Sequence, residues 1–183
     1  MAGWQTESSK EVFQNPWFRV RQDRVRNHVG KELTYNVVDL HHPSVFIVAM
    51  NELGRVLLQQ SYRYSINRTV WEVPAGHAED DNLLENAQRE LLEETGLQSN
   101  DWTPLGTFFQ APGVGNMPFA VFLARNVQLV TDERDPDEDI QSGQFFSFDD
   151  IERNLLAHND HAVVTAGTLT ALYAAKLYNE KEQ

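Results

Sequence analysis

Three glutamates near the middle of the chain have the residue type and spacing of a metal-binding cluster. At about 100° per residue, Glu90, Glu93 and Glu94 share one face of a helix. Like charges four residues apart destabilise a helix by about 0.2–0.5 kcal/mol per pair. Arg89, four residues before Glu93, offsets part of that repulsion, and a divalent cation would offset more. Clustered carboxylate oxygens suit Mg²⁺ or Mn²⁺ rather than zinc. The alternative is an acidic helix face exposed to solvent.

The helix that carries these carboxylates is predicted from apolar residues at helical spacing. Leu84, Leu91 and Leu92 lie away from the carboxylates, on the side expected to face a core. Gly96 follows the last of them, where a helix commonly ends. A Pro-Ala-Gly turn at residues 74–76 precedes the helix. The predicted acidic helix therefore lies between a turn at residues 74–76 and a helix end at Gly96.

The rest of the chain alternates between strand and helix patterns. Residues 1–10 are polar, and we expect them to be loose. Asp149 or Asp150 is the expected cap of a short helix that ends near Leu156. An amphipathic helix is expected over residues 161–179. Strands are predicted at residues 44–50, 55–61, 69–73, 105–110, 119–125 and 144–148, with two more within residues 17–40. This order predicts an α/β fold, with helices on both faces of a mixed sheet.

Composition and charge narrow the class of protein. The 183 residues suit one domain with a small N-terminal extension. The 15 Lys and Arg against 27 Asp and Glu give a net charge of −12, which makes a nucleic-acid partner improbable because phosphate binding needs a basic face. The sequence has no cysteine, which excludes disulfides and thiolate chemistry. No apolar run approaches the roughly 20 residues of a membrane helix, and the N-terminus has no signal-peptide pattern. We therefore expect a cytoplasmic protein.

The segment around the acidic helix resembles the signature of the Nudix hydrolases, G-x5-E-x7-R-E-U-x-E-E-x-G-U, where U is aliphatic. The second half of the signature matches at every position: Arg89, Glu90, Leu91, Glu93, Glu94, Gly96 and Leu97. The first half departs from it. Asp81 replaces the first glutamate, and Gly76 lies one residue too close to the helix.

The resemblance implies a fold, a site and an assembly. The fold would be a Nudix-type α/β/α sandwich with a mixed sheet, plus an N-terminal antiparallel β hairpin. Residues 1–42 would be the N-terminal extension and β hairpin, which would carry the dimer contacts of a homodimer. Residues 43–183 would be the Nudix domain. Glu90, Glu93 and Glu94, together with the carbonyl near Gly76, would hold Mg²⁺ or Mn²⁺ ions. Arg89 would orient a glutamate through a charge-assisted hydrogen bond.

The flanking segments resemble the branch of the family that splits ADP-ribose and nucleotide sugars. Residues 15–20, 60–64 and 71–76 look like that branch, and Pro112 lies 15 residues beyond the signature, as a proline does there. The resemblance assigns Arg63, Trp17 and Pro112 to substrate binding. It assigns the base that activates water to the acidic loop over residues 132–139, where our choice is Glu138.

One departure keeps other substrates open. The branch usually has an acidic residue soon after the Pro-Gly, whereas residues 114–117 contain none. GDP-mannose, a dinucleotide or another nucleoside diphosphate derivative is therefore an alternative to ADP-ribose. A non-catalytic module that senses a nucleotide sugar, or an acidic scaffold protein without a ligand, is the alternative from another functional class.

Overall fold

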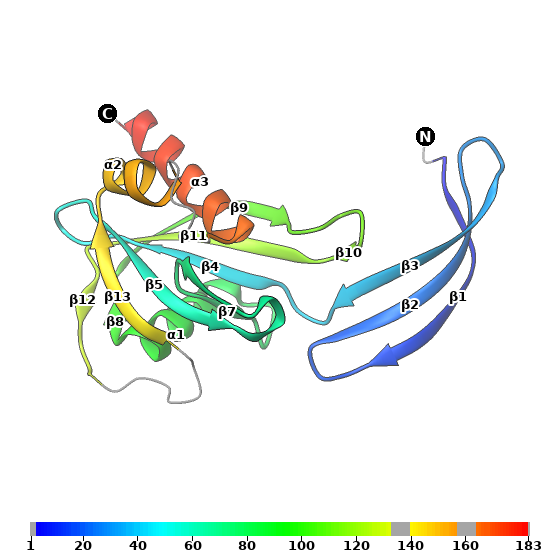
Figure 1. The fold of residues 1–183 in the computed structure, drawn as a ribbon, viewed down its shortest axis with the longest axis horizontal. Coiled ribbons are helices and arrows are strands. Elements are labelled where there is room, and N and C mark those ends of the chain that lie inside the picture. The colour runs from blue at the N-terminus through cyan, green and yellow to red at the C-terminus, as the bar shows by residue number, and fades with distance from the viewer. Residues whose placement is uncertain (1–2, 133–139, 157–163, 183) are drawn as a thin grey trace. The chain divides into compact units, whose positions relative to one another are not determined.

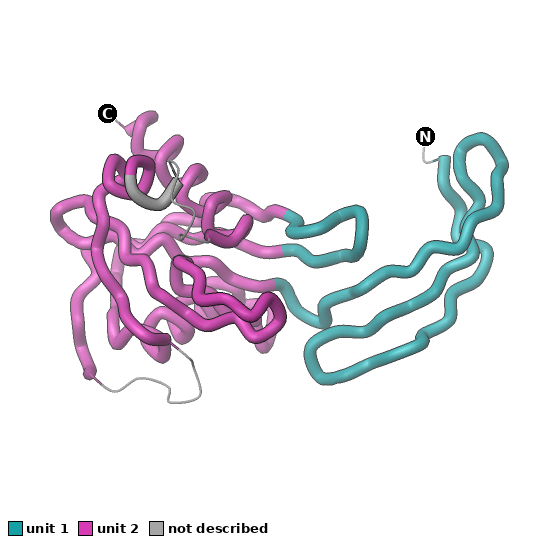
Figure 2. Tube along the Cα trace, viewed as in Figure 1, with its two compact units in different colours: residues 1–43, 109–118 teal, residues 44–108, 119–183 magenta. Residues whose placement is uncertain are grey.

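The computed structural model describes residues 3–132, 140–156 and 164–182. The chain divides into two compact units, shown in Figure 2. Unit 1 consists of residues 1–43 and 109–118, and unit 2 consists of residues 44–108 and 119–183. Within the described residues, no helix has both the length and the apolar character that crossing a membrane requires.

Unit 2 is built on a mixed four-stranded sheet. β4 (Ser44–Ala49) runs parallel to β11 (Pro118–Arg125), β7 (Ala75–His77) pairs antiparallel with β4, and β9 (Asp101–Phe109) forms the other edge. Every residue of β4 is buried, as expected for a continuous apolar run that is covered on both faces.

Two helices cover the opposite faces of this sheet, as Figure 1 shows. Alternate residues of β4 point to opposite sides. Val45 and Ile47 pack in one apolar cluster with Leu91 of α1 (Leu83–Thr95). Phe46 packs in a second cluster with Leu172 of α3 (Ala166–Glu182). The predicted α/β/α sandwich with a mixed sheet is therefore confirmed.

Smaller elements complete unit 2. β5 (Val56–Arg63) lies between β13 (Ile140–Phe146) and β6 (Arg68–Glu72), and the short 3₁₀ turn η1 (Tyr64–Ile66) joins β5 to β6. β8 (Leu97–Gln98) pairs with β12 (Gln128–Leu129). After β13 come a single helical turn, α2 (Phe148–Asp150), and a π-helical segment, η2 (Ile151–Leu156).

Unit 1 is a four-stranded sheet in the order β1-β2-β3-β10. β1 (Gln5–Gln14), β2 (Phe18–Arg26) and β3 (Glu32–Leu40) are antiparallel neighbours, and β10 (Gly115–Asn116) runs parallel to β3. The predicted antiparallel hairpin within residues 17–40 is confirmed. The prediction that residues 1–10 are loose is wrong, since most of them belong to β1. Every residue of β1 is exposed, so its backbone pairing with β2, rather than an apolar pattern, makes it a strand.

The structure also corrects details at helix ends. Gly96 ends α1 as predicted, with a left-handed φ of 72°. Leu84 does not face the core: it is 38% exposed, whereas Leu91 is fully buried. The cap of the turn at residue 148 is Ser147 rather than Asp149 or Asp150, because the Ser147 hydroxyl accepts from the Asp150 amide at 3.0 Å. The last helix begins at residue 166 and ends at residue 182; residues 161–163 of the prediction lie outside the described residues.

Candidate functional site

The central sheet of unit 2 holds the two ends of the acidic segment. Gly76 is paired with Val45 in the ladder between β7 and β4. The first turn of α1 is capped by Asn82, whose side chain accepts from the Glu85 amide at 3.4 Å. Since Leu91 anchors α1 to the same sheet, Gly76 and the glutamates of α1 are held on one rigid support.

Gly76 lies directly against the carboxyl group of Glu90. A Cβ atom at Gly76 would collide with the carboxyl group of Glu90. Glu90 is 9% exposed and Glu94 is 4% exposed. Only Glu93 has a substantially exposed side chain. The alternative of a fully solvated acidic helix face is therefore wrong for Glu90 and Glu94.

Arg89 links two of the three glutamates. Its Nη1 donates to Glu93 Oε2 at 2.6 Å, which is the predicted pair across one helical turn. Its Nη2 donates to Glu90 Oε1 at 2.9 Å. Burial by itself would lower the pKa of Arg89, but the charges of Glu90 and Glu93 outweigh it and raise that pKa. Arg89 is therefore a permanent positive charge within the acidic cluster.

Glu94 is held by groups from two other segments of unit 2. The side-chain amide of Gln59, on β5, donates to Glu94 Oε2 at 2.9 Å, and the backbone amide of Ala75, on β7, donates to the same oxygen at 3.3 Å. Both donors favour the ionised carboxylate. Gln59 is a site residue that the sequence did not reveal, because only the fold brings it to a partner 35 residues away.

Arg63 lies at the end of β5, and it pairs with another buried acid, Glu72. Arg63 Nη2 is 2.5 Å from Glu72 Oε1, and the Glu72 side chain is only 6% exposed. His77 is close enough to feel the charge of Arg63: burial first, and then that charge, lower the pKa of His77. In the sequence, Glu72 is only one residue of the segment 71–76 that resembles the nucleotide-sugar branch. Its burial and its pairing with Arg63 identify it as a candidate site residue in the structure.

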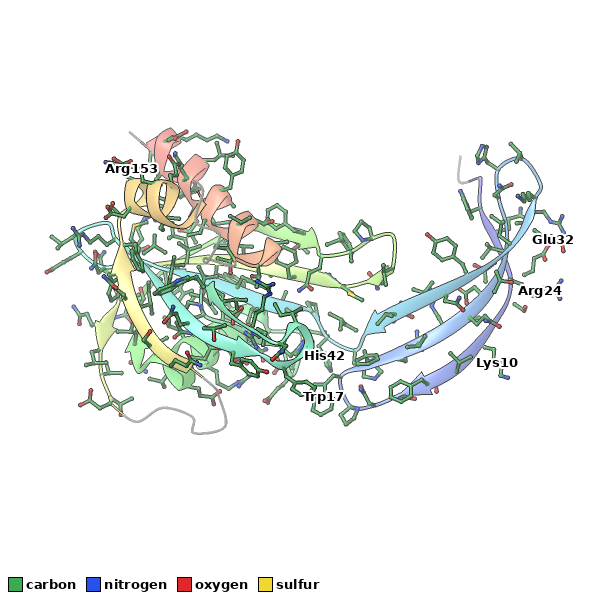
Figure 3. The ribbon with its side chains drawn as sticks, viewed as in Figure 1. Lys10, Trp17, Arg24, Glu32, His42 and Arg153 are labelled. Carbon is green, nitrogen blue, oxygen red and sulfur yellow. The ribbon has the colours of Figure 1, made fainter. Side chains whose placement is uncertain are left out.

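The remaining site residues of the prediction belong to unit 1 or lie outside the described residues. Trp17, between β1 and β2, and Pro112, in the turn before β10, are exposed residues of unit 1. Trp17 is labelled in Figure 3. Glu138 lies outside the described residues. Of the acids before α1, Asp80 contacts the helix through its side chain, whose Oδ1 accepts from the Asn86 side chain at 2.7 Å. Asp81 contacts it through its backbone oxygen, which accepts from the Leu83 amide at 3.1 Å.

The chemistry of this donor set fits a hard divalent cation. The carboxylates of Glu90, Glu93 and Glu94 and the backbone oxygen of Gly76 are the ligand types that Mg²⁺ and Mn²⁺ prefer. In the described parts of the chain, no three acidic or histidine side chains already converge on one point at metal-binding distances. Two of the carboxylates are instead turned toward Arg89. A cation would therefore compete with Arg89 for Glu90 and Glu93.

Comparisons with known proteins agree with the signature. The model of the NUDIX domain matches residues 40–166, and that of the nucleoside diphosphate sugar hydrolase N-terminal domain matches residues 4–38. The chain is 36% identical over 131 residues to the ADP-ribose pyrophosphatase of Mycobacterium tuberculosis (strain ATCC 25618 / H37Rv), covering 69% of this chain and 62% of that protein. It is 29% identical over 135 residues to the ADP-ribose pyrophosphatase of Bacillus subtilis (strain 168), covering 73% of this chain and 72% of that protein.

Solved structures give the same fold. A crystal structure of an ADP compounds hydrolase superposes with a TM-score of 0.84 at 19% identity, covering 100% of this chain and 97% of the other. At that identity the likeness concerns the fold alone.

The close approach at Gly76 leads to a prediction about stability. Gly76→Ala should lower the free energy of unfolding by about 1–3 kcal/mol, because the added methyl group displaces the buried Glu90 carboxyl group. Urea denaturation measures the change. Gly143→Ala is the control, since the atom nearest to its methyl group would be Leu57 Cδ1 at 3.4 Å, an ordinary contact. Equal stability of both variants and the natural protein would contradict the close approach.

Proposed function

The chain belongs to the Nudix family, and on that premise we propose that it is a Mg²⁺- or Mn²⁺-dependent pyrophosphatase. Its substrate would be a nucleoside diphosphate sugar resembling ADP-ribose, split into a nucleoside monophosphate and a sugar phosphate. The observation that carries this proposal is the fixed set of carboxylates on α1, two of them buried, placed against the backbone of Gly76. Relatives that act on ADP-ribose favour this substrate class over the alternatives.

We assign the metal ligands to Glu90, Glu93, Glu94 and the backbone oxygen of Gly76. A Mg²⁺ ion held by these ligands would neutralise the charge of the diphosphate and lower the pKa of an attacking water. The protein's own groups prepare the ligands for this task. Gln59 and the amide of Ala75 orient the carboxylate of Glu94 by hydrogen bonds, and Arg89 orients those of Glu90 and Glu93.

The reaction needs a base and contacts to the substrate. Water adds to one phosphorus, the bridging P–O bond breaks, and the water's proton passes to a base, for which we propose Glu138. We propose that Arg63 binds a phosphate of the substrate, with Glu72 fixing its guanidinium. Trp17 is proposed to stack on the nucleobase of the substrate, and Pro112 is proposed to shape the loop around the sugar. Since residues 114–117 lack an acid, the order of preference among sugar nucleotides is the property to measure.

A mutation at the buried carboxylate tests the reaction. With ADP-ribose and Mg²⁺, Glu94→Gln should lower kcat by about 10²-fold or more, because the neutral amide no longer binds the cation. Circular dichroism should be unchanged, since the amide oxygen can still accept from Ala75. The measurement is release of phosphatase-sensitive product from a panel of ADP-ribose, other sugar nucleotides and dinucleotides.

The control for this assay is Glu85→Gln, an exposed acid in the first turn of the same helix. It should keep the natural kcat. Hydrolysis that is undiminished in Glu94→Gln, or that persists in EDTA, would refute the proposed activity.

Within the same panel, Arg63→Gln should raise KM more than it lowers kcat.

Cation binding should also be visible as stability. A ligand that binds only the folded state stabilises it by about 2.7 kcal/mol at a hundred times its Kd, and about 1 kcal/mol shifts Tm by ~2–4 °C in a chain of this size. Mg²⁺ at millimolar concentration should therefore raise Tm by several degrees, and KCl of equal ionic strength should not. A rise of the same size in Glu90→Gln/Glu94→Gln would place the cation elsewhere.

We further propose that residues 1–42 form the dimer contact of a homodimer and residues 43–183 the catalytic domain. The support is the apolar surface of unit 1, a one-layered sheet that exposes Trp4, Val12, Phe13 and Trp17. Sedimentation equilibrium should give a dimer for the natural chain and a monomer for Val12→Glu/Phe13→Glu. Val29→Glu, in the β2–β3 turn and 72% exposed, should remain a dimer. A natural chain that sediments as a monomer at micromolar concentration would contradict this assembly.

A further inference from the structure

Unit 1 contains a polar cavity that the proposed reaction does not use. Its volume is about 620 Å³. All four strands of the unit 1 sheet contribute to its wall. The lining residues are Ser9, Arg19, Arg21, Asp39, Leu40, His41 and Asn116. Leu40 is the one apolar side chain among them.

A shared carboxylate holds the two arginines of this cavity side by side. Arg21 Nε donates to Asp39 Oδ2 at 2.7 Å, and Arg19 Nε donates to the same oxygen at 3.3 Å. Arg21 Nη1 also pairs with Asp23. The side chains of Asp39 and Asp23 are 11% and 4% exposed, so both carboxylates are fixed anchors. Because β2 alternates regularly against β3, Arg19 and Arg21 share one face of the sheet.

The anchoring bonds leave a surplus of hydrogen-bond donors at the cavity. Arg19 bonds to Asp39 through Nε. Among the described residues, its two terminal nitrogens have no protein acceptor. Arg21 Nη2 has none either. The Asn116 amide and the Ser9 hydroxyl add neutral donors. His41 Nε2 lies 3.0 Å from the backbone oxygen of Asn15, which leaves Nδ1 as its second polar atom.

A donor surplus of this kind suits a ligand that is rich in acceptors. A tetrahedral phosphate offers several strong acceptor oxygens, and guanidinium groups match its geometry. The charges of Arg19 and Arg21 are balanced by Asp39 and Asp23, so affinity must come from prearranged donors rather than from net charge. In a chain with net charge −12, this predicts millimolar rather than micromolar binding.

We propose that the cavity of unit 1 is a binding site for the phosphate group of a small phosphomonoester or for inorganic phosphate. The site is formed by the terminal nitrogens of Arg19 and Arg21, with Ser9 and Asn116 as neutral donors. It belongs to unit 1, whereas the acidic helix belongs to unit 2, and it needs no metal. It therefore does not depend on the proposed hydrolysis.

Isothermal titration calorimetry of the whole chain in EDTA tests this site. EDTA removes divalent cations, so phosphate bound through the acidic helix does not contribute. Inorganic phosphate and ribose 5-phosphate are titrated in parallel at constant ionic strength, which distinguishes the free ion from the sugar ester. Arg19→Gln should raise Kd at least about tenfold, because it removes charge-assisted hydrogen bonds while leaving the more buried Arg21 pairs intact.

Two further variants guard the interpretation. Asn116→Asp should abolish binding by placing a carboxylate in the cavity wall. Arg24→Gln is the matched control, because Arg24 lies on the opposite face of the same strand. Its side chain is 68% exposed and pairs with Glu32; both residues are labelled in Figure 3. This variant should leave Kd unchanged. Absence of heat with both ligands, or equal weakening by Arg19→Gln and Arg24→Gln, would overturn the site. Hydrolysis measured separately in Mg²⁺ bears only on the proposed function.

Discussion

The burial of two carboxylates against one strand is the constraint around which unit 2 is arranged. An isolated carboxylate costs several kcal/mol to remove from water, so Glu90 and Glu94 must be compensated locally. Arg89 supplies a charge to Glu90, and Gln59 and Ala75 supply donors to Glu94. Each compensating group comes from a different part of the fold. The acidic face can exist only because β5, β7 and α1 are already in place.

The apolar core makes that placement rigid. β4 is buried on both faces, so its alternate side chains fix α1 on one side and α3 on the other. Gly76 then brings the β7 backbone close to the Glu90 carboxyl group. A larger residue would move Glu90, and a looser α1 would let it turn toward solvent. Packing thus sets the positions of charged groups whose own interactions with one another are repulsive.

The sequence predicted the parts of this arrangement that depend on local spacing. The helix over the signature, its end at Gly96 and the pair between Arg89 and Glu93 follow from residues within one or two turns. The contacts of Glu94 with Gln59 and of Arg63 with Glu72 did not follow, because the packing of α1 against β5 makes the first and the pairing of β5 with β6 makes the second. β1 was missed because its residues are all exposed and the strand is ordered by its pairing with β2, which includes the ion pair between Glu7 and Arg26. The prediction that Leu84 faces the core was wrong, because helical spacing allows a wider apolar face than α1 buries.

The acidic helix of unit 2 and the cavity of unit 1 present groups of opposite charge. On α1, three carboxylates gather near Arg89, the Gln59 side chain and the backbone amide of Ala75. In unit 1, two guanidiniums share one oxygen of Asp39, and their terminal N–H groups exceed the acceptors around them. The proposed cation would bind the carboxylates, and the proposed oxyanion would bind the guanidiniums. Because the net charge of the whole chain is −12, neither local preference follows from composition, and each depends on which groups the fold brings together.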